Sequence, residues 1–117
     1  MTAVATTDRK VQLAARAALD RKAVDLVVLD VQGLSSVTDF FVVCSGRSTT
    51  HVASIAAAVR AAMKAEVLLL HAEGTPESGW ILLDYGDVLV HVFLEETRVY
   101  YALERLWGDA PSVPLER

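Results

Sequence analysis

The sequence has little of what disulfides, metal centres and membrane spans require. Its single cysteine, Cys44, excludes an internal disulfide framework and a cysteine-rich metal site. No apolar run approaches the ~20 residues of a membrane-spanning helix, and the N-terminus lacks the basic-then-apolar order of a signal peptide. We therefore expect an intracellular, cytoplasmic protein with no membrane partner.

Length and composition predict one small globular domain. The chain has 117 residues, of which 53% are hydrophobic and 22% charged, as in ordinary folded domains. A chain of this length has room for a single core. We expect the domain to cover residues 1–110 and a loose C-terminal tail to cover residues 111–117, because Pro111 and Pro114 prevent a helix from resuming.

The net charge of −4 is unevenly distributed along the chain. Residues 1–65 hold 8 basic and 5 acidic side chains, whereas residues 66–117 hold 3 and 10. Phosphate contacts need lysine and arginine, so the acidic half is unsuited to bare nucleic acid. It is suited to a basic protein partner.

Apolar periodicity and turn residues predict an α+β fold. Asp8 and Ser48 are the predicted N-caps of the first two helices. In the last helix, the side chains predicted to face inward are Val99, Ala102, Leu103 and Leu106. The predicted elements are a helix at 9–22, strands at 25–31 and 39–45, a helix at 49–65, a strand at 67–71, hairpin strands at 80–84 and 87–93, and a helix starting near 97. This order indicates a single mixed five-stranded sheet with packed helices.

The hairpin GWILLDYGDVLVHVF, residues 79–93, is apolar on both faces. A two-residue turn at Tyr85-Gly86 would pair Trp80 with His91 and Asp84 with Asp87. One face would then be aliphatic, with Ile81, Leu83, Val88, Val90 and Val92. The other face would hold Trp80, Leu82, Asp84, Asp87, Leu89, His91 and Phe93. A three-residue loop would shift the pairing and place valines beside carboxylates.

Three interpretations of this mixed face remain open: a docking surface, burial under the first helix, or a homodimer interface of the free protein. Three helices are too few to cover both faces of a five-stranded sheet, and exposed aromatic and leucine side chains with acidic edges are typical of interface hot spots. The candidate partner-binding residues are Trp80, Leu82, Asp84, Tyr85, Asp87, Leu89, His91 and Phe93.

Motifs for catalysis are weak. SGRSTTH, residues 45–51, is a glycine turn before a helix that could hold an anion, but it lacks a Walker lysine. His71 and Glu73 resemble the H-x-E of zinc deaminases without its cysteines, and Cys44 is interpreted as an inert core thiol. We expect no catalytic residue, metal or cofactor. The rival hypothesis is a small nucleotide-binding or nucleotidyltransferase-like enzyme that uses the SGRS turn.

Two segments carry a family resemblance: LDVQGLSSVTDFFVVCSGRSTTHVASIA, residues 29–56, and WILLDYGDVLVHVF with RVYYALERLWGDAP, within residues 80–111. Together they resemble the ribosomal silencing factor family, also called Iojap-like proteins. The resemblance implies a nucleotidyltransferase-like topology without transferase activity. It also implies binding to the large ribosomal subunit through ribosomal protein L-fourteen, without sequence-specific nucleic-acid contacts. Translation under nutrient limitation would be repressed because subunit joining is sterically blocked.

Overall fold

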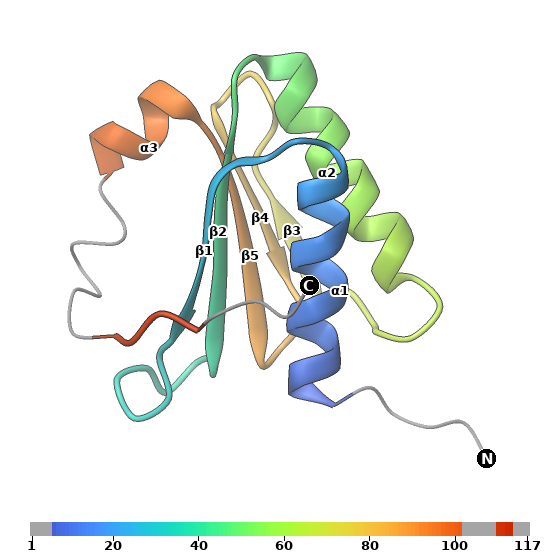
Figure 1. The fold of residues 1–117 in the computed structure, drawn as a ribbon, viewed down its shortest axis with the longest axis vertical. Helices are drawn as coiled ribbons and strands as arrows, with labels where there is room; N and C mark the ends of the chain where they lie inside the picture. The colour runs from blue at the N-terminus through green and yellow to red at the C-terminus, as the bar shows by residue number, and fades with distance from the viewer. Residues whose placement is uncertain (1–5, 102–109, 114–117) are drawn as a thin grey trace.

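The computed structural model describes residues 6–101 and 110–113, and it contains one sheet with three helices (Figure 1). The elements are α1 (Thr7–Asp20), β1 (Val24–Asp30), β2 (Phe40–Gly46), α2 (Thr49–Met63), β3 (His71–Glu73), β4 (Trp80–Asp84), β5 (Val88–Leu94) and α3 (Glu95–Tyr101). In Figure 1, α1 and α2 lie on one side of the sheet and α3 lies on the other.

The five strands are ordered β1-β2-β5-β4-β3. All neighbours are antiparallel except β2 and β5, which are parallel, so the sheet is mixed. The predicted α+β class with a single mixed five-stranded sheet is confirmed. The parallel pair is the decisive feature, because it places the FFVVC strand directly beside the hairpin strand VLVHVF.

The first two helices each begin after a residue whose side-chain hydroxyl accepts a hydrogen bond from a backbone amide of the first turn. Ser48 caps α2 as predicted, because its Oγ accepts a hydrogen bond from the His51 amide at 3.1 Å. The predicted cap of α1 is wrong: Thr6 accepts from the Arg9 amide at 3.2 Å, and Asp8 lies inside the first turn. An acidic side chain there still complements the helix dipole.

The main core lies between these two helices and the aliphatic face of the sheet. Helix α1 contributes alanines and one valine, and α2 contributes larger side chains such as Ile55 and Met63. They pack against Val42, Val90 and Val92 from the two parallel strands. The small alanine side chains allow α1 to pack close to the sheet.

Cys44 lies in this core and is fully buried. Burial raises the pKa of its thiol to about 12, although the charge of Arg98 opposes the shift. We expect the native protein to resist thiol reagents at pH 8 and to react only when denaturant unfolds it, because the thiolate is the reactive form. Labelling followed by mass spectrometry tests this expectation, and labelling of the native protein at the rate of a free thiol would contradict it.

Several predicted element boundaries differ from the observed ones, and the largest difference concerns the third strand. The strand predicted at 67–71 is observed as β3, residues 71–73. Its partner strand β4 ends at Asp84, which pairs with His71, so the residues just before His71 have no strand of the described sheet beside them. One further hydrogen bond joins the Leu70 amide to the Asp84 carbonyl at 2.8 Å. Leu68 is consequently 76% exposed. The second hairpin strand covers 88–94 rather than 87–93, and the last helix begins at 95 rather than near 97.

The last helix and the tail also differ from expectation. Val99 is 80% exposed, not inward, because α3 turns Arg98 to the sheet, where its guanidinium donates to Ser45 Oγ at 3.0 Å. Ala102, Leu103 and Leu106 lie outside the described residues. Residues 111–113 are not loose: the Asp30 amide donates to the Pro111 carbonyl at 2.9 Å, and the Val113 amide donates to the Val28 carbonyl at 2.8 Å.

None of the helices described by the structure has the length and apolar character needed to cross a membrane.

Candidate docking surface

The hairpin turn is Gly86-Asp87 rather than Tyr85-Gly86. The Tyr85 amide donates to the Val88 carbonyl at 3.0 Å, and Gly86 has a φ of +91°. Glycine occupies the first position of such a turn because that position requires a positive φ, which a tyrosine would strain. The predicted pairing of Asp84 with Asp87 is therefore wrong.

The corrected register pairs Trp80 with Phe93, Leu82 with His91, and Asp84 with Leu89. Relative to the prediction, the partner strand has shifted by two residues. Side chains alternate with a period of two, so a shift of two residues leaves every strand side chain on its predicted face. The separation into an aliphatic and a mixed face is confirmed, although its pairs are different.

An aromatic cluster forms the centre of the mixed face. The ring of Trp80 stacks on Phe93 with centroids 4.9 Å apart, and Phe41 from β2 meets the edge of the His91 ring at 4.9 Å. Phe41, His91 and Phe93 are buried, whereas Trp80 is partly exposed. Trp80 is therefore the outer member of the cluster and the one that a partner can reach.

His91 is held neutral inside this cluster. Its Nδ1 accepts a hydrogen bond from Trp80 Nε1 at 3.2 Å, so the ring proton resides on Nε2. That Nε2 is buried and has no hydrogen-bond partner within the described part of the chain. Burial lowers the pKa of His91 to about 4. The residue is thus a packing and orienting group for Trp80, and it carries no charge at neutral pH.

Acidic groups line the edge of the same face. Asp84 lies opposite His71 and Glu73 lies opposite Leu82 in the pairing of β3 with β4. Directly paired residues project to one side of a sheet, so both carboxylates accompany Leu82. We call Trp80, Leu82, Asp84 and Leu89, all partly exposed, the docking face, and Glu73 lies at its edge.

Two candidate residues do not belong to this face. Tyr85 is only 3% exposed and packs in the core on the side of the helices. Asp87 lies in the turn, where its carboxylate pairs with Lys10 Nζ at 2.7 Å and accepts from the Thr7 hydroxyl. Asp87 therefore ties α1 to the hairpin and is not aimed at a partner, contrary to the prediction.

This tie predicts a measurable loss in an Asp87→Asn variant. Burial raises the pKa of the Asp87 carboxyl, but hydrogen bonds from Lys10 and Thr7 outweigh burial and leave the pKa below its ordinary value. We expect the free energy of unfolding to fall by about 1 kcal/mol at pH 7, a modest value because the pair is partly solvated.

The depressed pKa also fixes the pH at which this effect should fade. The carboxylate stabilises the folded state above the ordinary aspartate pKa, and this contribution is lost as the pH falls through the lower folded value. Urea unfolding of both proteins should therefore converge below about pH 4. An undiminished difference at pH 2 would show that the Asp87 charge is not its source.

The first helix does not cover the mixed face. Val11, Ala14 and Ala18 of α1 pack in the aliphatic core instead. On the opposite side, a second cluster contains Leu29, Val31, Phe41, Val43 and Phe93, with Trp80, Leu89 and Ala110 packed against it. The interpretation that places the mixed face under the first helix is therefore wrong.

The SGRS turn is already occupied by its own chain. The Arg47 amide donates to His51 Nδ1 at 2.9 Å, and His51 Nε2 contacts the Arg21 carbonyl at 2.7 Å. A Cβ at Gly46 would lie 2.8 Å from the Val52 nitrogen, so close packing explains this glycine. The described residues contain no group of three or more histidine, cysteine, aspartate or glutamate side chains suited to a metal. These contacts favour a structural turn.

The sequence-based prediction missed Phe41, Glu73 and His71. Alternation along FFVVC places Phe41 and Val43 on one face of the strand and Phe40, Val42 and Cys44 on the other. The sequence therefore contained information on which face Phe41 occupies. That information could not be used without knowing that β2 lies beside β5. Glu73 lies between the predicted strands at 67–71 and 80–84, because the observed strand His71–Glu73 carries no β-branched residue to indicate it.

Comparison with known proteins agrees with these features. The family model described as "Ribosomal silencing factor during starvation" matches residues 4–117. The chain is 44% identical to the ribosomal silencing factor RsfS of Halalkalibacterium halodurans, over 90% of this chain and 91% of the relative. It is 42% identical to the protein of that name from Bacillus subtilis, over 90% of each.

The fold matches solved structures closely. A crystal structure of a Chromobacterium violaceum protein aligns with a TM-score of 0.85 and 36% identity, over 89% of this chain and 88% of the other. A Bacillus halodurans structure aligns with a TM-score of 0.79 and 40% identity, over 90% and 96%. Since both sequence and fold agree along nearly the whole length, this chain belongs to the ribosomal silencing factor family.

Proposed function

We propose that the docking face binds ribosomal protein L-fourteen on the large ribosomal subunit and thereby blocks joining of the small subunit. The observation that carries this proposal is the position of Trp80, which is partly exposed and held rigidly by stacking and a hydrogen bond beside two carboxylates. Rigid aromatic anchors supply much of the energy of protein interfaces. The acidic edge complements a basic ribosomal protein.

The mechanism is steric and needs no chemical step. A bound domain with Cα extents of 43 × 30 × 28 Å occupies the surface that the small subunit would otherwise approach. The protein acts as a translational repressor in the cytoplasm when nutrients are limiting. It uses no cofactor, membrane contact or sequence-specific nucleic-acid contact.

Co-sedimentation with purified subunits tests this function. We expect the protein to pellet with large subunits and not with small ones, and to reduce formation of joined ribosomes as its concentration rises. Higher salt should weaken binding, because charged groups contribute to the encounter. Binding to small subunits, or joining that is unaffected at saturating protein, would contradict the proposal.

Calorimetry separates this function from the rival one. Titration with a nucleoside triphosphate and magnesium should give no heat of binding, because the Arg47 amide of the SGRS turn donates to His51 Nδ1 and the Ser48 hydroxyl accepts from the His51 amide. Saturable heat that disappears in an Arg47→Gln variant would instead support the nucleotide-binding hypothesis.

The free protein can also be tested for pairing through the same face. If two copies bury Trp80 against each other, adding large subunits should dissociate the dimer, since one surface cannot serve both partners. Sedimentation velocity of the free protein measures this directly.

A further inference from the structure

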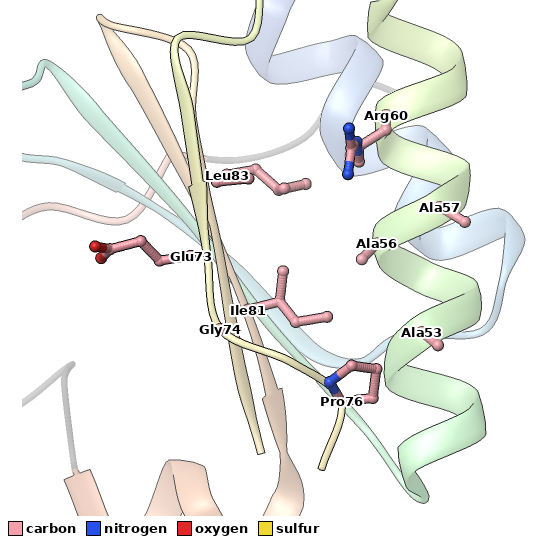
Figure 2. Close-up of a pocket in the computed structure, with 10 residues that line it drawn as sticks. Ala53, Ala56, Ala57, Arg60, Glu73, Gly74, Pro76, Ile81 and Leu83 are labelled. Atoms are coloured by element: carbon pink, nitrogen blue, oxygen red, sulfur yellow. The ribbon is translucent and has the colours of Figure 1, made fainter. Parts of the chain in front are cut away.

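A groove lies on the opposite side of the sheet from the docking face, between α2 and the β3–β4 edge (Figure 2). Its volume is about 520 Å³. Ala53, Ala56 and Ala57 form the helical wall, and Ile81 and Leu83 point toward them from β4. The small side chains on α2 leave this space open.

A second hollow of about 530 Å³ shares Arg60 with the first. It is lined by the end of α2, by Lys64 directly after it, and by Leu68 and Tyr85. The two hollows run along the helix from Ala53 to Lys64, a distance of about 16 Å at 1.5 Å per residue. That length matches about five residues of extended chain.

The charge of this groove is positive in an otherwise acidic protein. Within the described residues, neither Arg60 nor Lys64 has an ion pair. The neighbouring acids are engaged elsewhere: Glu66 pairs with Arg9 at 3.0 Å, and Glu73 pairs with His71 at 3.1 Å. Figure 2 shows the Glu73 side chain pointing away from α2. Arg60 lines both hollows and Lys64 lines the second. Of the residues that the structure describes, Glu73 is the one acidic residue that lines either hollow, and its side chain points away from the two cations.

The hydroxyl of Tyr85 is a second, independent sign of a ligand. The side chain lines the second hollow, and its buried hydroxyl has no hydrogen-bond partner in the described part of the chain. A buried hydroxyl without a partner destabilises a fold, so such groups are uncommon. A carboxylate bound beside Arg60 could supply the missing acceptor.

The edge of the sheet completes the arrangement. Among the strands that the structure describes, β3 is the outermost and pairs only with β4, whereas the opposite edge strand, β1, is covered by residues 111–113. An open edge strand is a template for an added extended chain. The groove, the cations and the open strand therefore occupy the same side of the molecule.

From these observations we infer that the α2–β3 groove binds a short, extended acidic segment of a partner protein, with carboxylates on Arg60 and Lys64 and apolar side chains over Ile81 and Leu83. This partner would differ from the ribosomal protein, because the docking face is acidic and lies across the sheet. The protein could then hold a second, acidic protein while it is bound to the ribosome.

The test is an NMR titration of the isotope-labelled full chain with an acetylated five-residue peptide that alternates leucine and glutamate. We expect saturable shifts of amide signals from Ala56, Ala61 and Ala72. A variant carrying Arg60→Gln and Lys64→Gln should bind at least about tenfold more weakly, because an interface carboxylate loses its partners. The control Arg47→Gln removes one positive charge from an exposed residue before α2 and outside the groove, and it should bind as the wild type does.

The Tyr85→Phe variant separates an effect on peptide binding from an effect on folding. Removing an unpaired buried hydroxyl should raise the melting temperature, while loss of the donor should weaken peptide binding about threefold. Absence of saturable shifts, equal binding by a leucine-lysine peptide, or unchanged affinity in the double variant would overturn the inference. Equal affinity for hexanoate alone would assign the groove to small acids and would also overturn it.

The same variants separate this inference from the proposed function. The double variant should co-sediment with large subunits normally, whereas a Trp80→Ala protein should retain peptide binding. Failure of ribosome binding in Trp80→Ala alone therefore leaves the groove untouched, and failure of peptide binding leaves the docking face untouched.

Discussion

Replacing Trp80 with alanine is expected to weaken binding to the large ribosomal subunit by about 30-fold or more, equivalent to ~2 kcal/mol. Trp80 is the reachable member of the aromatic cluster, and its ring is fixed by stacking on Phe93 and by the hydrogen bond to His91. A side chain that is already ordered loses little entropy when it binds. The measurement is a co-sedimentation titration beside a subunit-joining assay.

The same substitution should lower the free energy of unfolding by only about 1 to 2 kcal/mol, through the lost stacking and hydrogen bond. Val90→Ala is the matched control. Val90 lies on the same hairpin but is buried on the aliphatic face, so its truncation should cost a similar amount of stability and leave binding intact. Equal loss of binding in both variants would attribute the effect to destabilisation and remove the docking role of Trp80.

Acidification from pH 6.5 to pH 4 is expected to lower the free energy of unfolding by roughly 3 kcal/mol through His91. Burial lowers the folded pKa of His91 to about 4, whereas an unfolded histidine titrates near 6.5. Between these values the unfolded chain binds a proton that the folded chain excludes. Stability is therefore retained above the unfolded pKa and falls as the pH drops through this window.

Urea unfolding at a series of pH values measures this dependence. His91→Phe keeps an aromatic ring in the cluster but cannot titrate, so its stability should be nearly flat between pH 6.5 and 4. His71→Gln, an exposed control at the sheet edge, should retain the wild-type dependence. The Asp87 contribution falls at lower pH, so the two effects can be resolved. A wild-type slope in His91→Phe would assign the dependence to another group.

How far the candidate site could be predicted depends on the range of the interactions involved. Alternation along residues 80–93 placed Trp80, Leu82, Leu89 and the aliphatic side chains on the correct faces, because side-chain direction in a strand is local. Even the error in register preserved this result. The turn itself is misplaced because Gly86 can occupy either the second position of a Tyr85-Gly86 turn or the first position of a Gly86-Asp87 turn. The positive φ of Gly86, which the first position requires, selects the second of these turns.

Other assignments failed because they depend on distant parts of the chain. Asp87 looked like a surface charge until the fold placed Lys10 beside it, 77 residues away in sequence. Tyr85 is predicted as part of the hairpin tip, but the fold buries it among core residues of both helices and the sheet. Burial of a polar side chain depends on which element packs above it, and residue type alone does not specify that element.

The sequence by itself determined the class of the fold, the two faces of the hairpin, the Ser48 cap and the family, since each follows from local periodicity, local hydrogen bonding or a contiguous motif. Only the tertiary structure decided that β2 runs parallel to β5, which brings Phe41 against His91. It also decided that residues 111–113 lie along β1 and that Arg60 faces a groove. These are contacts between segments far apart in the chain, fixed by the joint packing of helices and sheet, and no short pattern encodes them.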